Sequence, residues 1–151
     1  MRPPLAVALV LLGLVAAACG GGAATPAPVA TTSYTCCPRD DVDRVWQPGE
    51  TLTLHWTARP GTRSGASHVV RLTATLTGPY ADAGALKRGA AAARRLQNVV
   101  TTTDERTEPA PVSSIVLPSD LPPGLYNLAT DVDLGGGSHA GGASVVRVGA
   151  A

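Results

Sequence analysis

The feature that most constrains the fold is a strict alternation of apolar and polar side chains over residues 51–57. Leu52, Leu54 and Trp56 share one side of this stretch, and hydrophilic side chains share the other. Successive side chains of an extended strand point to opposite faces, so a period of two predicts a strand that is buried on one face. A turn signal over residues 47–50, which read Gln-Pro-Gly-Glu, predicts where this strand begins.

The alternation returns after residue 69. Val70, Leu72, Ala74 and Leu76 share one face, and the pattern stops at Gly78-Pro79. Short apolar stretches separated by turns rich in Pro and Gly are typical of an antiparallel sandwich or barrel. We therefore expect one all-β domain over residues 34–151. Its further strands are predicted within Val99–Thr103, Ser114–Leu117, Leu125–Leu134 and Ser144–Val148.

Residues 81–97 predict neither a helix nor a strand clearly. The alanines at 90–93 favour a helix, whereas Gly84 and Gly89 oppose one. If this segment is helical, it places four basic side chains on one face, namely those of Lys87, Arg88, Arg94 and Arg95. Such a face is typical of a solvated surface, and it also suits contact with anionic lipid headgroups.

The turn before the strand at Leu125 carries a more specific pattern. Residues 121–126 read Leu-Pro-Pro-Gly-Leu-Tyr. This resembles the tyrosine corner of immunoglobulin-like sandwiches, in which the phenol bonds to nearby backbone. The resemblance implies an immunoglobulin-like antiparallel β-sandwich with a bonded Tyr126 hydroxyl. The chain has no Cys…Trp…Cys framework, so the likeness concerns architecture and not antibody domains.

The first 18 residues have the three parts of an export signal. Arg2 supplies the positive charge, Leu5–Val15 the apolar centre, and Ala16–Ala18 the small residues that a signal peptidase accepts. The apolar run is shorter than the roughly 20 residues that span a bilayer as a helix. We therefore interpret residues 1–18 as a removed signal peptide.

Cys19 follows these alanines directly and precedes three glycines. Ala16-Ala17-Ala18-Cys19 resembles the lipobox of bacterial lipoproteins, although Ala16 stands where leucine is commonest. The resemblance implies that Cys19 carries diacylglycerol, and that the chain is held at the extracytoplasmic face of the cell membrane by this lipid. Residues 19–33 are then a lipidated cysteine and a flexible linker, because their Gly, Ala, Thr and Pro side chains bury little apolar surface.

Charge and composition disfavour nucleic acid as a partner. The chain has 12 basic and 11 acidic side chains, and Arg2 leaves with the signal peptide, so the mature charges balance. Nucleic-acid binding usually requires a clustered basic surface. Aromatic residues make up only 3% of the chain, which also disfavours stacking of bases.

Motifs of enzymes and cofactor sites are missing from the sequence. It contains no Gly-x-Ser-x-Gly, no phosphate-binding loop, no His-Glu-x-x-His and no dinucleotide fingerprint. Asp40, Asp41 and Asp43 cluster before the first alternating strand, and we interpret them as solvated loop carboxylates. We expect neither catalysis nor a bound cofactor.

Cys36 and Cys37 are adjacent, and they are the thiols that remain if Cys19 carries lipid. In an oxidising compartment they form a candidate disulfide, since secreted proteins favour such bonds. Free thiols, bridges to another molecule and a metal site are the alternatives that the residues leave open. A redox catalyst would have Cys-x-x-Cys, which does not occur here.

His139 lies in the glycine-rich stretch Gly137–Gly142, which predicts a turn before the last strand. Together with Gly124-Leu125-Tyr126 and Val145-Val146, this stretch is loosely similar to the end of the copper-resistance protein C family. That resemblance implies a copper-binding histidine at His139, with Cys36 and Cys37 as further weak metal candidates. Gly-Ser-His replaces the family's Asp-Gly-His, so a plain turn is the preferred interpretation.

Taken together, the residues favour a membrane-anchored binding or interaction module with an unidentified ligand, and an envelope protein is a candidate partner. A copper-handling protein and a structural envelope protein are the two alternatives.

Overall fold

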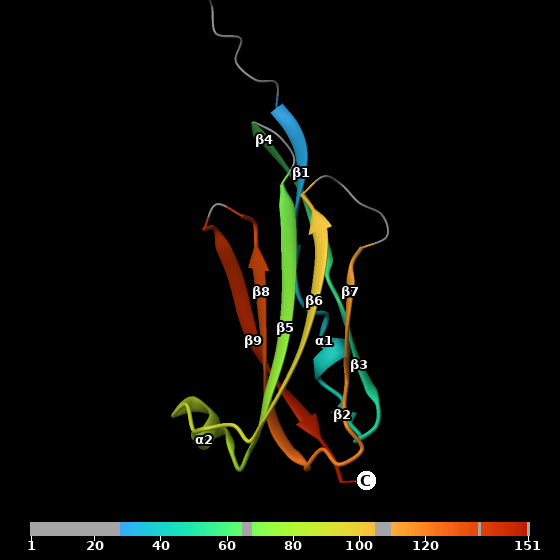
Figure 1. Cartoon of the computed structure of the whole chain (residues 1–151), viewed down its shortest axis with the longest axis vertical. Coiled ribbons are helices and arrows are strands. Elements are labelled where there is room, and N and C mark those ends of the chain that lie inside the picture. The colour runs from blue at the N-terminus through green and yellow to red at the C-terminus, as the bar shows by residue number, and fades with distance from the viewer. Residues whose placement is uncertain (1–27, 65–67, 105–109, 136, 151) are drawn as a thin grey trace, which may run out of the picture.

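The computed structural model describes residues 28–64, 68–104, 110–135 and 137–150. The expected signal peptide, the lipid-attachment residue Cys19 and the first part of the linker lie outside these ranges. Within them the chain is almost entirely strands and turns (Figure 1). Its two helices are short, α1 (Arg39–Val42) and α2 (Ala83–Lys87).

The larger sheet has five strands in the order β2-β9-β8-β5-β6. Neighbouring strands are antiparallel except at one edge, where β2 runs parallel to β9. The strands are β2 (Val45–Trp46), β5 (Val69–Tyr80), β6 (Arg94–Thr103), β8 (Gly124–Asp133) and β9 (His139–Val148).

Two strand pairs form the facing layer. β3 (Thr51–His55) pairs with β7 (Val112–Val116), and β1 (Pro28–Thr35) pairs with β4 (Thr57–Ser64). β4 follows β3 directly after Trp56, so the two pairs are continuous along one chain segment. The fold is therefore an all-β sandwich, as the sequence predicts. Figure 1 shows β1 and β4 at one end of the molecule and α2 at the other.

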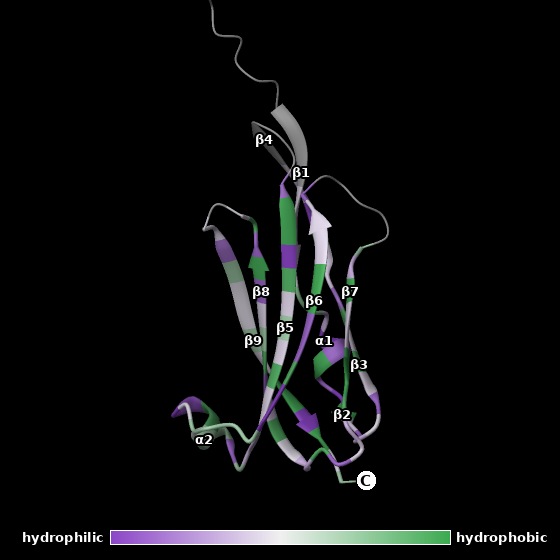
Figure 2. Cartoon of the chain, viewed as in Figure 1, coloured by the Kyte–Doolittle hydropathy of each residue, from purple (hydrophilic) through white to green (hydrophobic). Residues whose placement is uncertain are grey.

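The apolar residues of the two alternating stretches lie in the core, as the sequence predicts. Leu52 and Leu54 are fully buried, and Trp56 is 1% exposed. The larger sheet contributes the buried face of β5, which consists of Val70, Leu72, Ala74 and Leu76. Alternate residues of β8 and β9 are buried on the same side. The hydrophobic bands of β5 and β8 alternate with polar bands along each strand (Figure 2). Burial of this apolar surface is the main force that holds the two layers together.

The tyrosine corner that the sequence predicts is present. The Tyr126 hydroxyl donates a hydrogen bond to the backbone oxygen of Pro122, at 2.7 Å. The side chain itself is 1% exposed. Gly78 of β5 lies against its ring, since a Cβ at residue 78 would stand 2.5 Å from Cδ1 of Tyr126. This close contact requires glycine at residue 78.

Two predicted boundaries are wrong. Residues 28–33, expected at the end of the flexible linker over 19–33, belong to β1 and pair with β4. Their threonines and Val29 suit a strand, and the pairing is made by backbone atoms. Residues 139–142, expected within a glycine-rich turn, belong to β9 and pair with β8. Backbone hydrogen bonds need no large side chain, so Gly141 and Gly142 continue the strand.

The ambiguous segment 81–97 divides into a short helix and a strand. The Asp82 side chain accepts a hydrogen bond from the Ala85 amide and so caps α2, which ends before Gly89 at a φ of 67°. Arg94 and Arg95 begin β6. The four basic side chains therefore do not share a helical face, and that expectation is wrong.

Candidate functional site

The strongest candidate site is a small pocket between the two layers, at the open edge between β1 and β9. It has a volume of about 130 Å³. Its walls come from the end of β1, from Trp56 in the facing layer, and from the inward side of β8 and β9. The lining residues are Tyr34, Thr35, Cys36, Trp56, Thr130, Val132, Ala140, Gly141 and Gly142.

The pocket exists because one half of β9 has small inward side chains. Val146 and Val148 fill the space between the layers at the lower end of the strand. Four and six residues before Val146, the positions on the same face of β9 are Gly142 and Ala140. A Cβ at residue 142 would meet only the Thr130 Oγ1, at 3.6 Å. A side chain at residue 142 would therefore meet no close contact at its Cβ.

The walls of the pocket carry no charged side chain. Its two aromatic residues also use their polar atoms elsewhere. The Tyr34 hydroxyl donates to the Thr103 carbonyl at 3.1 Å, and the Trp56 Nε1 donates to the Ser113 hydroxyl at 2.9 Å. The pocket therefore offers mainly ring carbon, methyl groups and sulfur, which suits an apolar group.

Cys36 and Cys37 are joined in a disulfide in the structure. They lie between β1 and α1, where the chain crosses from one layer to the other. Both are half-buried, and Cys36 packs against both parts of the hydrophobic core while also lining the pocket. As disulfide sulfurs, they have no thiolate with which to hold a metal.

His139, the third candidate metal ligand, faces away from the pocket. Residues 146 and 148 of β9 point inward, so the odd-numbered His139 lies on the outer face of the larger sheet. Its Nδ1 lies 3.3 Å from Oδ2 of Asp131 on the neighbouring strand. Among the residues that the structure describes, no group of three or more His, Cys, Asp or Glu is arranged to hold a metal ion.

Each of the three histidines has an aspartate beside its Nδ1, and the sequence pattern does not predict these pairs. His55 lies 3.0 Å from Asp41, and His68 lies 3.6 Å from Asp104. Asp41 is buried and also accepts a hydrogen bond from the His55 amide at 2.7 Å, so its expected solvation is wrong. Fourteen residues separate this pair, so only the fold brings it together. The first of these contacts joins α1 to β3, and the second joins the residue before β5 to the segment after β6.

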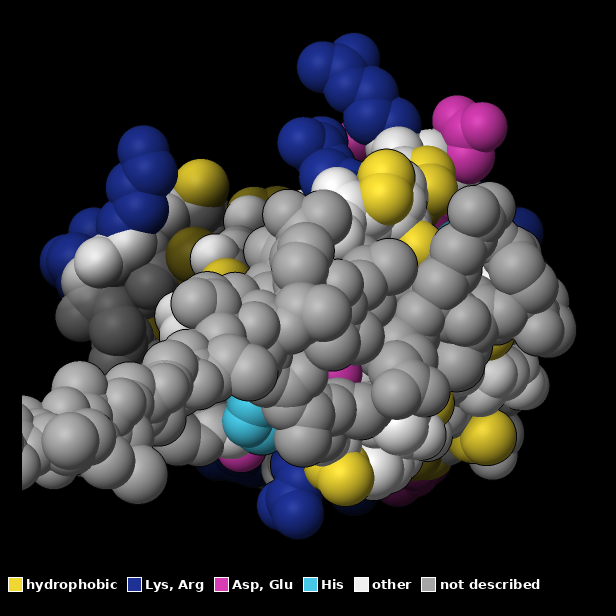
Figure 3. Space-filling view, turned by 90° about the horizontal axis from the view of Figure 1, so that it is seen from above, with side chains coloured by type: hydrophobic (Ala, Val, Ile, Leu, Met, Phe, Trp, Pro, Cys, Tyr) yellow, Lys and Arg dark blue, Asp and Glu magenta, His cyan; other side chains and the backbone are white. Residues whose placement is uncertain are grey.

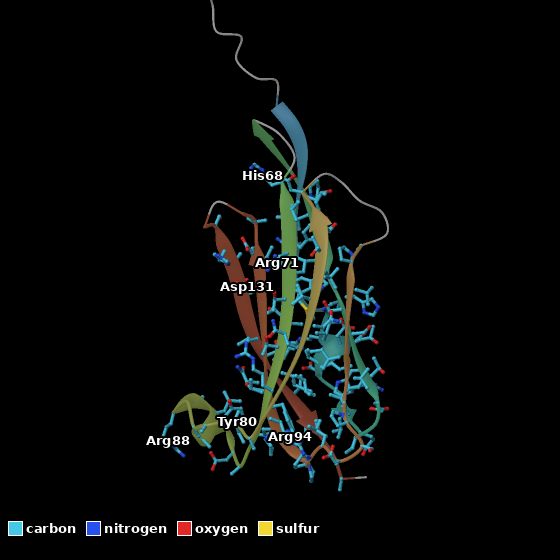
Figure 4. The ribbon with its side chains drawn as sticks, viewed as in Figure 1. His68, Arg71, Tyr80, Arg88, Arg94 and Asp131 are labelled. Carbon is cyan, nitrogen blue, oxygen red and sulfur yellow. A yellow bond between two sulfur atoms is a disulfide. The ribbon has the colours of Figure 1, made fainter. Side chains whose placement is uncertain are left out.

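The described basic side chains do not gather into one patch on the face seen from above. Figure 3 shows them in separate groups around the rim of the molecule as seen from above. Arg88 and Arg94 lie at the end of the molecule near α2, far from His68 at the other end (Figure 4). Arg94 forms an ion pair with Asp120 at 2.8 Å.

The unpaired edge of β9 is the second component of the candidate site. β2 pairs only with Arg147 and Val148. In the described part of the chain, no strand pairs with this edge between His139 and Val146. The Gly149 amide donates to Trp46 of β2, so the odd-numbered residues direct their backbone groups to this edge. Ala143 therefore presents its amide and carbonyl beside the pocket.

Comparison with protein-family models gives no match to this chain, and comparison with curated proteins gives none either. In the described residues, no helix has the length and apolar character needed to cross a bilayer.

Proposed function

We propose that this chain is a lipoprotein anchored through Cys19 at the extracytoplasmic face of the cell membrane, and that its sandwich acts as a binding module. The anchoring rests on the leader and on the position of Cys19 between three alanines and three glycines. The function as a binding module rests on one observation, the uncharged pocket between β1 and β9 with its aromatic wall of Tyr34 and Trp56.

Pockets of this kind bind ligands because an apolar group gains free energy when it leaves water. The walls of this one are held by the core, since Tyr34 and Trp56 are 3% and 1% exposed. Because these side chains are already ordered, little conformational entropy is lost when a ligand binds. No catalytic group lines the pocket, so binding is the activity that its chemistry supports.

Anchoring is tested by changing Cys19 to Ser and fractionating cells that express the full chain. We expect the wild-type chain in the membrane pellet, with acyl mass on its first residue. The Cys19→Ser chain should enter the supernatant or remain an uncleaved precursor. If it stays in the pellet at mature size, the lipoprotein proposal is wrong.

The structural alternative predicts a different result in a second experiment. A binding module should capture a defined partner from an envelope extract, whereas a purely structural protein should capture none above background. The matched control is Gly142→Val, which reduces the pocket. If the same proteins are captured by both chains, the pocket is not the site of binding.

A further inference from the structure

We infer that the open edge of β9 and the pocket beneath it together bind an extended peptide segment of a partner protein. The segment would add a strand to the larger sheet and insert one apolar side chain between the layers. This inference rests on the proposed function as a binding module, and it names the class of partner.

The first argument concerns the backbone of β9. An unpaired strand edge presents amide and carbonyl groups that pair readily with another extended chain, and proteins commonly protect such edges with charges or proline. Between Ala140 and Val146, β9 has no charged residue and no proline. β2 already forms two residue pairs along the same edge, at Arg147 and Val148. The residues before β2, Val42–Arg44, lie beside Val145, so an added strand would pair with the part of the edge from His139 to Ala143.

The second argument concerns the pocket below this edge. Inward side chains alternate along a strand, and strand addition gains its specificity from pockets that accept alternate side chains. Ala140 and Gly142 leave one such pocket open toward Tyr34 and Trp56. Its volume of about 130 Å³ suits one apolar side chain, and its uncharged walls disfavour an ionised one.

The size of the pocket also decides between a foreign peptide and a second copy of this chain. Two copies could pair through antiparallel β9 edges, with Gly142 near the two-fold axis. The inward residues that each copy would then supply are Ala140, Gly142 and Ser144. These side chains are too small to fill the space, so the pocket would stay empty. A peptide with a larger apolar side chain fills it.

Two substitutions in β9 test the two parts separately. Ala143→Pro removes an amide that points to the free edge, and an edge strand tolerates proline at such a position. Gly142→Val places a side chain in the pocket, where the nearest atom to its Cβ is the Thr130 Oγ1 at 3.6 Å. The matched control is Ala143→Val, which adds valine on the outer face of the same strand.

The experiment selects displayed linear peptides of random sequence on the purified protein, produced with its leader so that the host processes it. We expect selected peptides to share one apolar residue between neighbours of mixed type. Binding should weaken by about tenfold or more in Ala143→Pro and in Gly142→Val, and should be unchanged in Ala143→Val. The bound peptide should also slow hydrogen exchange at the Ala143 amide.

Three outcomes would overturn the inference. The first is no enrichment on the wild-type protein, and the second is binding by both test variants that is as tight as binding by the wild-type protein. The third is a concentration-dependent dimer that Ala143→Pro abolishes, which would assign the edge to a second copy. Each of these outcomes can be distinguished from a failure of the proposed function. Fractionation of Cys19→Ser tests only the anchor, and a partner captured equally by both β9 variants would keep the binding module at another surface.

Discussion

The Tyr126 hydroxyl and the Pro122 carbonyl are joined by a 2.7 Å hydrogen bond across a turn of four residues. The bond fixes the chain where it enters β8, the strand that separates β5 from β9 in the larger sheet. Because the ring is buried while its hydroxyl is bonded, this one side chain links the turn to the core.

Changing Tyr126 to Phe should lower the free energy of unfolding by about 1 kcal/mol, because it removes this bond and retains the ring. Urea denaturation followed by tryptophan fluorescence measures the change. Tyr80→Phe is the matched control, since the Tyr80 hydroxyl has only a 3.3 Å contact with Thr77 in a half-buried position. Equal effects of the two substitutions would contradict a special role for Tyr126.

The same tyrosine should make stability depend on alkaline pH. Burial raises the pKa of Tyr126 above its ordinary value of 10.0, although the positive charge of Arg94 opposes the rise. The folded state therefore holds the phenol proton more tightly than the unfolded state does. Its contribution to stability is complete below pH 10.0 and is lost as pH rises from that value through the raised pKa. Denaturation curves above that pH should show a steeper loss for wild type than for Tyr126→Phe. Parallel losses would refute the link.

Glycine at residue 78 should be far less replaceable than glycine at residue 142. A Cβ at residue 78 would lie 2.5 Å from Cδ1 of Tyr126 and 2.9 Å from the Leu125 carbonyl. Gly78→Ala should therefore destabilise the fold by about 1–3 kcal/mol through overpacking. Gly142→Ala meets no such contact and should change stability by about 0.5 kcal/mol or less. Thermal melting compares the two, and similar melting temperatures would be the contrary result.

Copper should bind no more tightly to the wild-type protein than to a variant without the three candidate ligands. Cys36 and Cys37 are joined to each other, and the His139 Nδ1 lies beside Asp131 on the outer face. A copper(I) site needs soft thiolate or thioether ligands, which this arrangement does not supply. Calorimetry on oxidised and reduced protein measures the copper affinity. The comparison is the triple variant Cys36→Ser, Cys37→Ser, His139→Ala. Tight one-to-one binding that the triple variant loses would favour the copper-handling alternative.

Strand positions were predictable where large side chains alternate. Leu52, Leu54 and Trp56 carry enough apolar surface to fix both the period and the buried face. The upper half of β9 was not predictable, because Gly141 and Gly142 read as a turn. Their strand conformation comes from hydrogen bonds to β8, which depend on the backbone and on the neighbouring strand.

The candidate pocket was not predictable from the sequence for a related reason. Its walls come from four separate parts of the chain, and its volume depends on the absence of a side chain at Gly142. A short apolar pattern identifies side chains that fill space, and a pocket leaves no such pattern. The burial of Asp41 is similar, because the contact with His55 exists only after α1 packs beside β3.

The two neighbouring glycines of β9 differ in their freedom to change over evolutionary time. A Cβ at residue 141 would stand 2.6 Å from the Thr130 carbonyl, whereas one at residue 142 makes only an ordinary contact with the Thr130 Oγ1 at 3.6 Å. Drift at residue 141 would disturb the sheet and be removed by selection. A single codon change at residue 142 could instead resize the pocket while the scaffold persists. In descendants of this chain, new ligand preferences would then arise first at residue 142, with residue 141 held constant beside it.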